Sequence, residues 1–132
     1  MILGTGIDIV DVGRIEHSCE RFGERFLLRI LRPGELSYCR AQKRMAPHVA
    51  ARFAAKEAIS KAFGTGIGRQ LGWQDMEVVR KESGEPFVVF HGAGEELLRR
   101  RGGTRVHISL SHTRAHATAM AILEGPDSSG SA

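Results

Sequence analysis

Residues 51–66 read ARFAAKEAISKAFGTG, a pattern typical of a helix that ends at its glycines. At about 100° per residue, the alanines gather with Ile59 and Phe63 on one side, where small side chains let the backbone approach a neighbouring element closely. Pro47 fits the first turn of this helix, and Gly64 fits its C-terminal cap. Since a P-loop precedes its helix rather than following it, GTGIG at 64–68 is interpreted as a cap and tight turn.

The charged side of this helix allows two interpretations. Glu57 and Lys61 are four residues apart, so on spacing alone they are most simply an exposed ion pair. Alternatively, Glu57 is a metal ligand beside cations that bind phosphate. Asp8 taken alone fits an edge strand or a loop end, but with Glu57 it could offer oxygen ligands to Mg²⁺. Their separation in sequence leaves open whether the two carboxylates meet.

Composition indicates one globular domain. The chain has 132 residues, of which 42% are hydrophobic and 26% charged, and this length can support its own core. The net charge of +4 favours anionic partners. No apolar stretch is long enough to span a bilayer, and the start lacks the basic region of a signal peptide. We therefore expect a cytoplasmic protein, and the lone thiols Cys19 and Cys39 agree with a reducing compartment.

Hydrophobic periodicity and turn residues predict an α+β fold. Strands are predicted at residues 2–10, 76–81, 86–90, 106–112 and 117–123. Helices are predicted at residues 12–22, 23–31, 35–42, 47–63 and 92–102, with Asp11 as a cap of the first. The first strand alternates, and its two faces are Ile7 and Ile9 against Gly6, Asp8 and Val10.

The end of the chain has no apolar anchor. Residues 124–132 read EGPDSSGSA, a composition too polar and glycine-rich to pack. We predict a domain over residues 1–123 and a disordered tail over residues 124–132.

Two further polar patterns each have a structural and a functional interpretation. HISLSH at 107–112 places His107 on a polar strand face, which suits a half-exposed sheet or hydrogen bonds to a phosphorylated ligand. A helical region near the N-terminus carries Arg21, Arg25 and Arg29 at spacings of four. These arginines suit a solvated face, or a docking surface for an acidic protein or nucleic acid.

Taken together, three segments resemble the holo-acyl-carrier-protein synthases, the short-chain 4′-phosphopantetheinyl transferases. The segments are GTGIDIV at 4–10, RFAAKEAxxKAFGTG at 52–66 and HISLSHT at 107–113. LGWQDMEV, GEPF and Arg14 also fit, so the resemblance spans nearly the whole chain. It implies an antiparallel sheet packed with helices in a homotrimer, with active sites between subunits.

The resemblance also implies an activity and its residues. Coenzyme A would supply 4′-phosphopantetheine to a serine of apo acyl-carrier protein for fatty acid biosynthesis, releasing adenosine 3′,5′-bisphosphate. Asp8 and Glu57 would bind Mg²⁺, and Lys61 would contact the phosphate under attack. Positions associated with the nucleotide are matched by Lys43, Arg44, Arg52 and His107. The basic carrier-protein docking surface is matched by Arg14, Arg21, Arg25 and Arg29.

Two other functions remain open from the residues. A basic nucleic-acid-binding module would bind DNA or RNA with steep salt dependence and without Mg²⁺. A metal-dependent phosphohydrolase using the same carboxylates would break down coenzyme A without an acceptor protein. The resemblance favours neither, and we expect no nucleic-acid or membrane partner.

Overall fold

A computed structural model describes residues 1–127 of the chain. Its elements are β1 (Ile2–Asp11), α1 (Val12–Phe22), α2 (Glu24–Ile30), α3 (Pro33–Arg40), α4 (Met45–Phe63), the 3₁₀ helix η1 (Trp73–Asp75), β2 (Met76–Arg80), β3 (Pro86–Phe90), α5 (Ala93–Arg100), β4 (Arg105–His112) and β5 (His116–Glu124). The predicted α+β class is confirmed, and the predicted elements are all present with ends shifted by a few residues.

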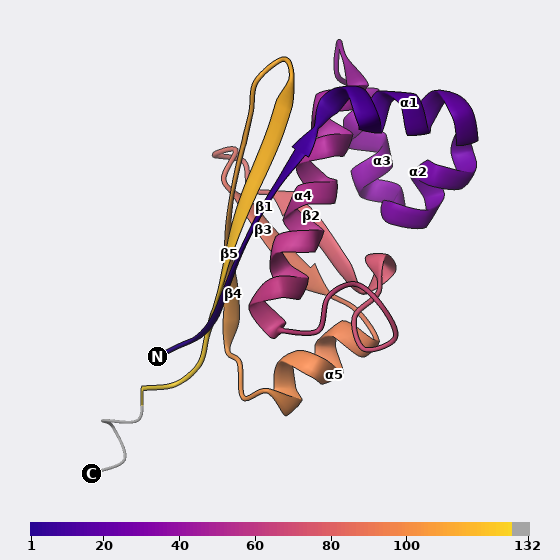
Figure 1. The fold of residues 1–132 in the computed structure, drawn as a ribbon. Helices are drawn as coiled ribbons and strands as arrows, with labels where there is room; N and C mark the ends of the chain where they lie inside the picture. Colours follow the sequence, from indigo (N-terminus) through magenta and orange to yellow (C-terminus); the bar gives the residue numbers. More distant parts are fainter. Residues whose placement is uncertain (128–132) are drawn as a thin grey trace.

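The strands form two antiparallel sheets. One has the order β1-β5-β4 and the other is the hairpin β2-β3. Figure 1 shows the long helix α4 lying along the three-stranded sheet, with α1, α2 and α3 grouped near one end of it and α5 near the other. The α4 helix therefore forms the centre of the core. None of the helices in residues 1–127 is long and apolar enough to cross a membrane.

The predicted cap residues act as expected. The Asp11 side chain accepts a hydrogen bond of 2.8 Å from the backbone N–H of Gly13 at the start of α1. Gly64 ends α4 in the left-handed conformation with a φ of 77°, which glycine adopts without steric cost. Residue types with strong backbone preferences thus fix the ends of these helices.

The two faces of β1 alternate as predicted, but the face that packs on α4 is the glycine-rich one. A Cβ atom added to Gly6 would lie 1.9 Å from the carbonyl oxygen of Ala58. A Cβ atom added to Gly4 would lie 1.9 Å from the carbonyl oxygen of Ala62. Ile7 and Ile9 point outward and are each 68% exposed. At Gly4 and Gly6 the strand and helix backbones are so close that a side chain would not fit between them.

The charged side of α4 is not a solvent face. Arg52 and Lys56 are buried, and Lys56 forms an ion pair with buried Glu35 at 2.8 Å. The helix is therefore covered on several sides, including the side that carries Arg52 and Lys56. Burial of a charge needs such a partner, because an unpaired charge in the interior is costly.

The ordered chain extends beyond residue 123, which corrects the predicted start of the tail. Glu124 is the last residue of β5, and the backbone N–H of Gly125 donates to the carbonyl of Met1 at 2.8 Å. Asp127 pairs with the N-terminal amine at 2.8 Å. These contacts join the segment to Met1. Residues 128–132 of the predicted tail lie outside the described residues.

Candidate active site

Asp8 and Lys61 meet where β1 crosses α4. The Lys61 Nζ atom lies 3.1 Å from Asp8 Oδ1 and donates to the carbonyl oxygen of Ile7 at 2.9 Å. The Asp8 side chain is 18% exposed and that of Lys61 is 51% exposed, so the pair lies at the surface and is open to a ligand. The contact depends on Gly6, because its missing Cβ lets the strand approach the helix.

Glu57 belongs to the same site. Burial raises the pKa of its carboxyl, the nearby charge of Asp8 raises it further, and Lys61 partly offsets both effects. The simplest interpretation from the sequence, an exposed Glu57–Lys61 ion pair, was wrong, because the carboxylate that pairs with Lys61 is Asp8. Two carboxylates and one ammonium group thus share one electrostatic environment.

The donor set of this site suits Mg²⁺. Mg²⁺ is commonly held by one or two carboxylates, while water and substrate phosphates complete its octahedron. Asp8 and Glu57 supply two such carboxylates. A bound cation would offset the repulsion between them, which adds to the effect of burial on the pKa of Glu57. The described residues contain no group of three or more His, Cys, Asp or Glu side chains arranged for a metal, so a Zn²⁺-type cage is not part of the described structure.

A second, cationic cluster lies around Tyr38, at the end of α4 away from Lys61. The Arg52 guanidinium stacks 4.3 Å from the centre of the Tyr38 ring, and that of Arg80 lies 5.6 Å from it. His48 packs edge-on against Tyr38 and against His112, with ring centroids 5.8 and 5.1 Å apart. We call these five residues the Tyr38 cluster.

The Tyr38 cluster has unused hydrogen-bond donors. The buried Nε atoms of Arg52 and Arg80 have no partner within the described part of the chain. Burial lowers the pKa of His48, and the charges of His112, Arg52 and Arg80 lower it further. Unpaired donors and accumulated positive charge are the chemistry of an anion site.

The predicted nucleotide residues make separate contacts in the structure. Arg52 belongs to the Tyr38 cluster, and Arg44 is exposed nearby in the chain, donating to the carbonyl of Arg114 at 3.2 Å. Lys43 is exposed beside it. His107 lies elsewhere, on the outer face of β4, where it bonds Glu124 at 3.0 Å. His107 therefore lies on the face of β4 opposite to the one from which His112 reaches the Tyr38 cluster.

His112, Arg80 and His48 were missed as site residues. Alternation along β4 was the available signal for His112, because residues 106, 108, 110 and 112 share the face opposite to His107. That face is directed toward α4, where His112 reaches His48. Nothing local in the sequence connects Arg80, on β2, with Tyr38.

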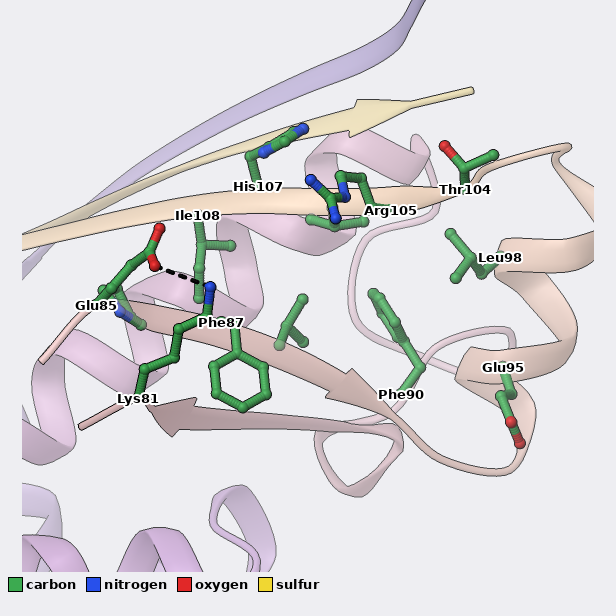
Figure 2. Close-up of a pocket in the computed structure, with 13 residues that line it drawn as sticks. Lys81, Glu85, Phe87, Phe90, Glu95, Leu98, Thr104, Arg105, His107 and Ile108 are labelled. Carbon is green, nitrogen blue, oxygen red and sulfur yellow. Dashed lines mark ion pairs between the residues drawn. The ribbon is translucent and has the colours of Figure 1, made fainter. Parts of the chain in front are cut away.

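His107 borders a cavity of about 480 Å³ between β3, α5 and β4. Figure 2 shows Phe87, Phe90 and Leu98 around this space, with the ion pair of Lys81 and Glu85 at one end. Its lining mixes apolar side chains with charged ones such as Glu95 and Arg105. Neither the carboxylates nor Lys61 of the α4 site line it.

The four predicted docking arginines are all exposed on α1 and α2. They are Arg14, Arg21, Arg25 and Arg29. Two large apolar side chains lie among them in the sequence and are also exposed, namely Phe22 at 50% and Leu28 at 54%. Arginine and aromatic side chains are both enriched at protein interfaces, and this pair of helices exposes both kinds.

Comparison with known proteins gives a consistent result. Residues 4–121 match the family model described as the 4′-phosphopantetheinyl transferase superfamily. The holo-[acyl-carrier-protein] synthase of Koribacter versatilis is 52% identical over 124 residues, which cover 94% of this chain and 99% of that one. The crystal structure of the synthase from Neisseria meningitidis is 35% identical, with a TM-score of 0.89, covering 94% of this chain and 99% of its own.

A further solved structure contains a ligand. The Helicobacter pylori holo-[acyl-carrier-protein] synthase in complex with coenzyme A is 32% identical, with a TM-score of 0.82. The match covers 91% of this chain and 99% of that one. The resemblance noted in the sequence is confirmed at the level of sequence family and of fold.

Proposed function

Because the chain belongs to the 4′-phosphopantetheinyl transferase superfamily, among its holo-acyl-carrier-protein synthases, we propose the following reaction for it. It transfers the 4′-phosphopantetheine group from coenzyme A to a serine of apo acyl-carrier protein, with Mg²⁺, and releases adenosine 3′,5′-bisphosphate. The observation that carries this proposal is the convergence of Asp8, Glu57 and Lys61 where β1 crosses α4. We place the enzyme in the cytoplasm and in fatty acid biosynthesis.

In this reaction the serine oxygen attacks the phosphorus that bears pantetheine. The bond from that phosphorus to the bridging oxygen breaks, and the leaving group departs as adenosine 3′,5′-bisphosphate. Such transfer needs positioning and charge neutralisation more than covalent participation by the protein. Bound Mg²⁺, held by Asp8 and Glu57, would neutralise charge on the pyrophosphate.

Lys61 and Glu57 have distinct proposed roles. Lys61 is held beside Asp8 by the carbonyl of Ile7, so its ammonium group is positioned to contact the phosphate under attack. The serine proton must go to a base, which is either Glu57 acting through a water molecule or a metal-bound water.

The adenosine 3′,5′-bisphosphate half is proposed to bind at basic residues. Arg52, with an unpaired buried Nε atom, and the exposed Lys43 and Arg44 support an anion site at this end of α4. We add His112 to it on the evidence of the Tyr38 cluster. His107 is proposed to serve an active site shared with a neighbouring subunit.

A homotrimer is proposed on the same basis. The outer face of the three-stranded sheet exposes Ile7 and Ile9 at 68% each, and Met120, the partner of Ile7 across β1 and β5, at 39%. Neighbouring apolar side chains on a sheet face commonly mark an interface between chains. A cyclic trimer would cover this face and would bring His107 of one subunit toward the site of another.

The carrier protein is proposed to dock on α1 and α2. The exposed arginines Arg14, Arg21, Arg25 and Arg29 would steer an acidic partner. Phe22 and Leu28 would supply apolar contacts within the same surface.

The test is the intact mass of a recombinant apo acyl-carrier protein incubated with coenzyme A, Mg²⁺ and this enzyme. A gain of one phosphopantetheine that is absent with a chelator supports the proposal. Asp8→Asn and Glu57→Gln keep side-chain size and should raise the Mg²⁺ concentration needed. Coenzyme A cleavage without an acceptor would instead support a phosphohydrolase, and Mg²⁺-independent binding to DNA would support a nucleic-acid module.

A further inference from the structure

The C-terminal end of α2 is held by two side chains from distant parts of the chain. Gln74 of η1 donates from Nε2 to the carbonyl oxygens of Leu28 and Leu31 at 2.8 and 2.9 Å, and to that of Arg29 at 3.3 Å. Lys56 of α4 donates to the carbonyl oxygen of Ile30 at 2.6 Å. These two residues thus reach the four consecutive carbonyls at residues 28–31.

A helix as short as α2 needs such partners. It has seven residues, a length at which an isolated helix is not stable in water. The last four carbonyls of a helix have no partner within it. A donor or a positive charge at this end also interacts favourably with the helix dipole. Gln74 and Lys56 supply donors to these carbonyls, beside the core packing of Leu27 and Ile30.

The two holding residues are themselves fixed. The backbone carbonyl of Gln74 accepts a hydrogen bond of 2.7 Å from the Arg32 side chain. Lys56 also bonds the carboxylate of Glu35 at 2.8 Å and the carbonyl of Trp73 at 3.0 Å. A rigid network therefore connects α2 to α4 and η1.

This network joins the docking surface to the active site. Arg25, Leu28 and Arg29 are exposed on α2, whereas Lys56 directly precedes Glu57 on α4. We propose that Gln74 and Lys56 are positioning residues that hold α2 at a fixed place relative to Glu57, so that a docked carrier protein presents its serine to the site. The proposal rests on the proposed function, because it takes α2 as part of the carrier-protein surface.

The test compares Gln74→Glu with Gln70→Glu. Gln74→Glu keeps the size of the side chain but replaces its donors with a carboxylate facing three carbonyl oxygens. Gln70 is in the same connecting segment, is exposed, and accepts from Arg100 at 3.3 Å, so its variant controls for the added charge. Loss of a hydrogen bond at the helix end should raise the KM for apo acyl-carrier protein by roughly fivefold or more.

Two readouts separate positioning from general damage. Gln74→Glu should leave the KM for coenzyme A unchanged and should speed hydrogen exchange of the α2 amides, and Gln70→Glu should do neither. Wild-type exchange in α2 together with wild-type KM for the carrier protein would overturn the inference, as would an equal rise of both KM values. If the wild-type enzyme leaves the carrier protein unmodified, the proposed function fails, and hydrogen exchange still tests the contact of Gln74 with α2.

Discussion

Replacing Gly6 with alanine tests the contact on which the active site is built. The added Cβ would lie 1.9 Å from the carbonyl oxygen of Ala58, 2.8 Å from its carbonyl carbon and 2.9 Å from the backbone nitrogen of Ala62. All three atoms belong to the backbone of α4, so no side-chain rotation relieves the clash. Ordinary contact begins at 3.4 Å, so β1 and α4 must separate locally by about 1.5 Å.

The expected cost follows from that displacement. Overpacking a core costs about 1–3 kcal/mol, and we expect the upper end because both elements are central. For a chain of this length such a loss lowers the Tm by roughly 10 °C. Asp8 is two residues further along the same face of β1, and a misplacement of about 1 Å in a catalytic group can cost on the order of 10²-fold in rate.

The assay compares two glycine-to-alanine variants by thermal unfolding and by transfer of phosphopantetheine to the carrier protein. Gly68 is the control, because an added Cβ meets no atom within 4 Å and its φ is not positive. We expect Gly68→Ala to match the wild type and Gly6→Ala to lose both stability and activity. Equal Tm and equal rates for the two variants would refute the close β1–α4 contact as the basis of the site.

Three further predictions concern buried groups. Lys56→Met or Glu35→Gln alone should lower the free energy of unfolding in urea by about 3–5 kcal/mol, because each leaves a buried charge unpaired. The double variant should lose less than the sum of the two single losses, and additive losses would contradict the coupling. Because the pKa of His48 is lowered mainly by burial, its neutral form stabilises the fold above about pH 6.5 and this stability is lost as the pH falls through the lowered pKa. The unfolding free energy of His48→Gln should therefore fall less between pH 7.5 and 5 than that of the wild type, and parallel curves would argue against the effect. Burial raises the pKa of Cys39 to about 11, which leaves about one Cys39 side chain in a thousand as thiolate at pH 8. Iodoacetamide should therefore modify half-buried Cys19 first and Cys39 only on unfolding, and peptide mapping measures this order.

Local signals in the sequence were sufficient for the elements, whereas the site residues came from the family resemblance. Asp11 and Gly64 mark helix ends because their side chain or backbone freedom acts within a few residues. The alternation of β1 follows from the pleat of a strand. The resemblance selected Asp8, Glu57 and Lys61, and the structure brings these three residues together.

Partners across long separations could not be predicted from such signals. Lys61 pairs with Asp8, 53 residues away, rather than with Glu57 on its own helix, because the glycines of β1 bring that strand onto α4. Lys56 carries the same charge as Lys61 and lies on the same helix, yet it is buried on Glu35 and the end of α2. Helical spacing gives the direction of a side chain around the helix axis. The packing of the other elements determines whether that direction leads to water, a carboxylate or a helix end.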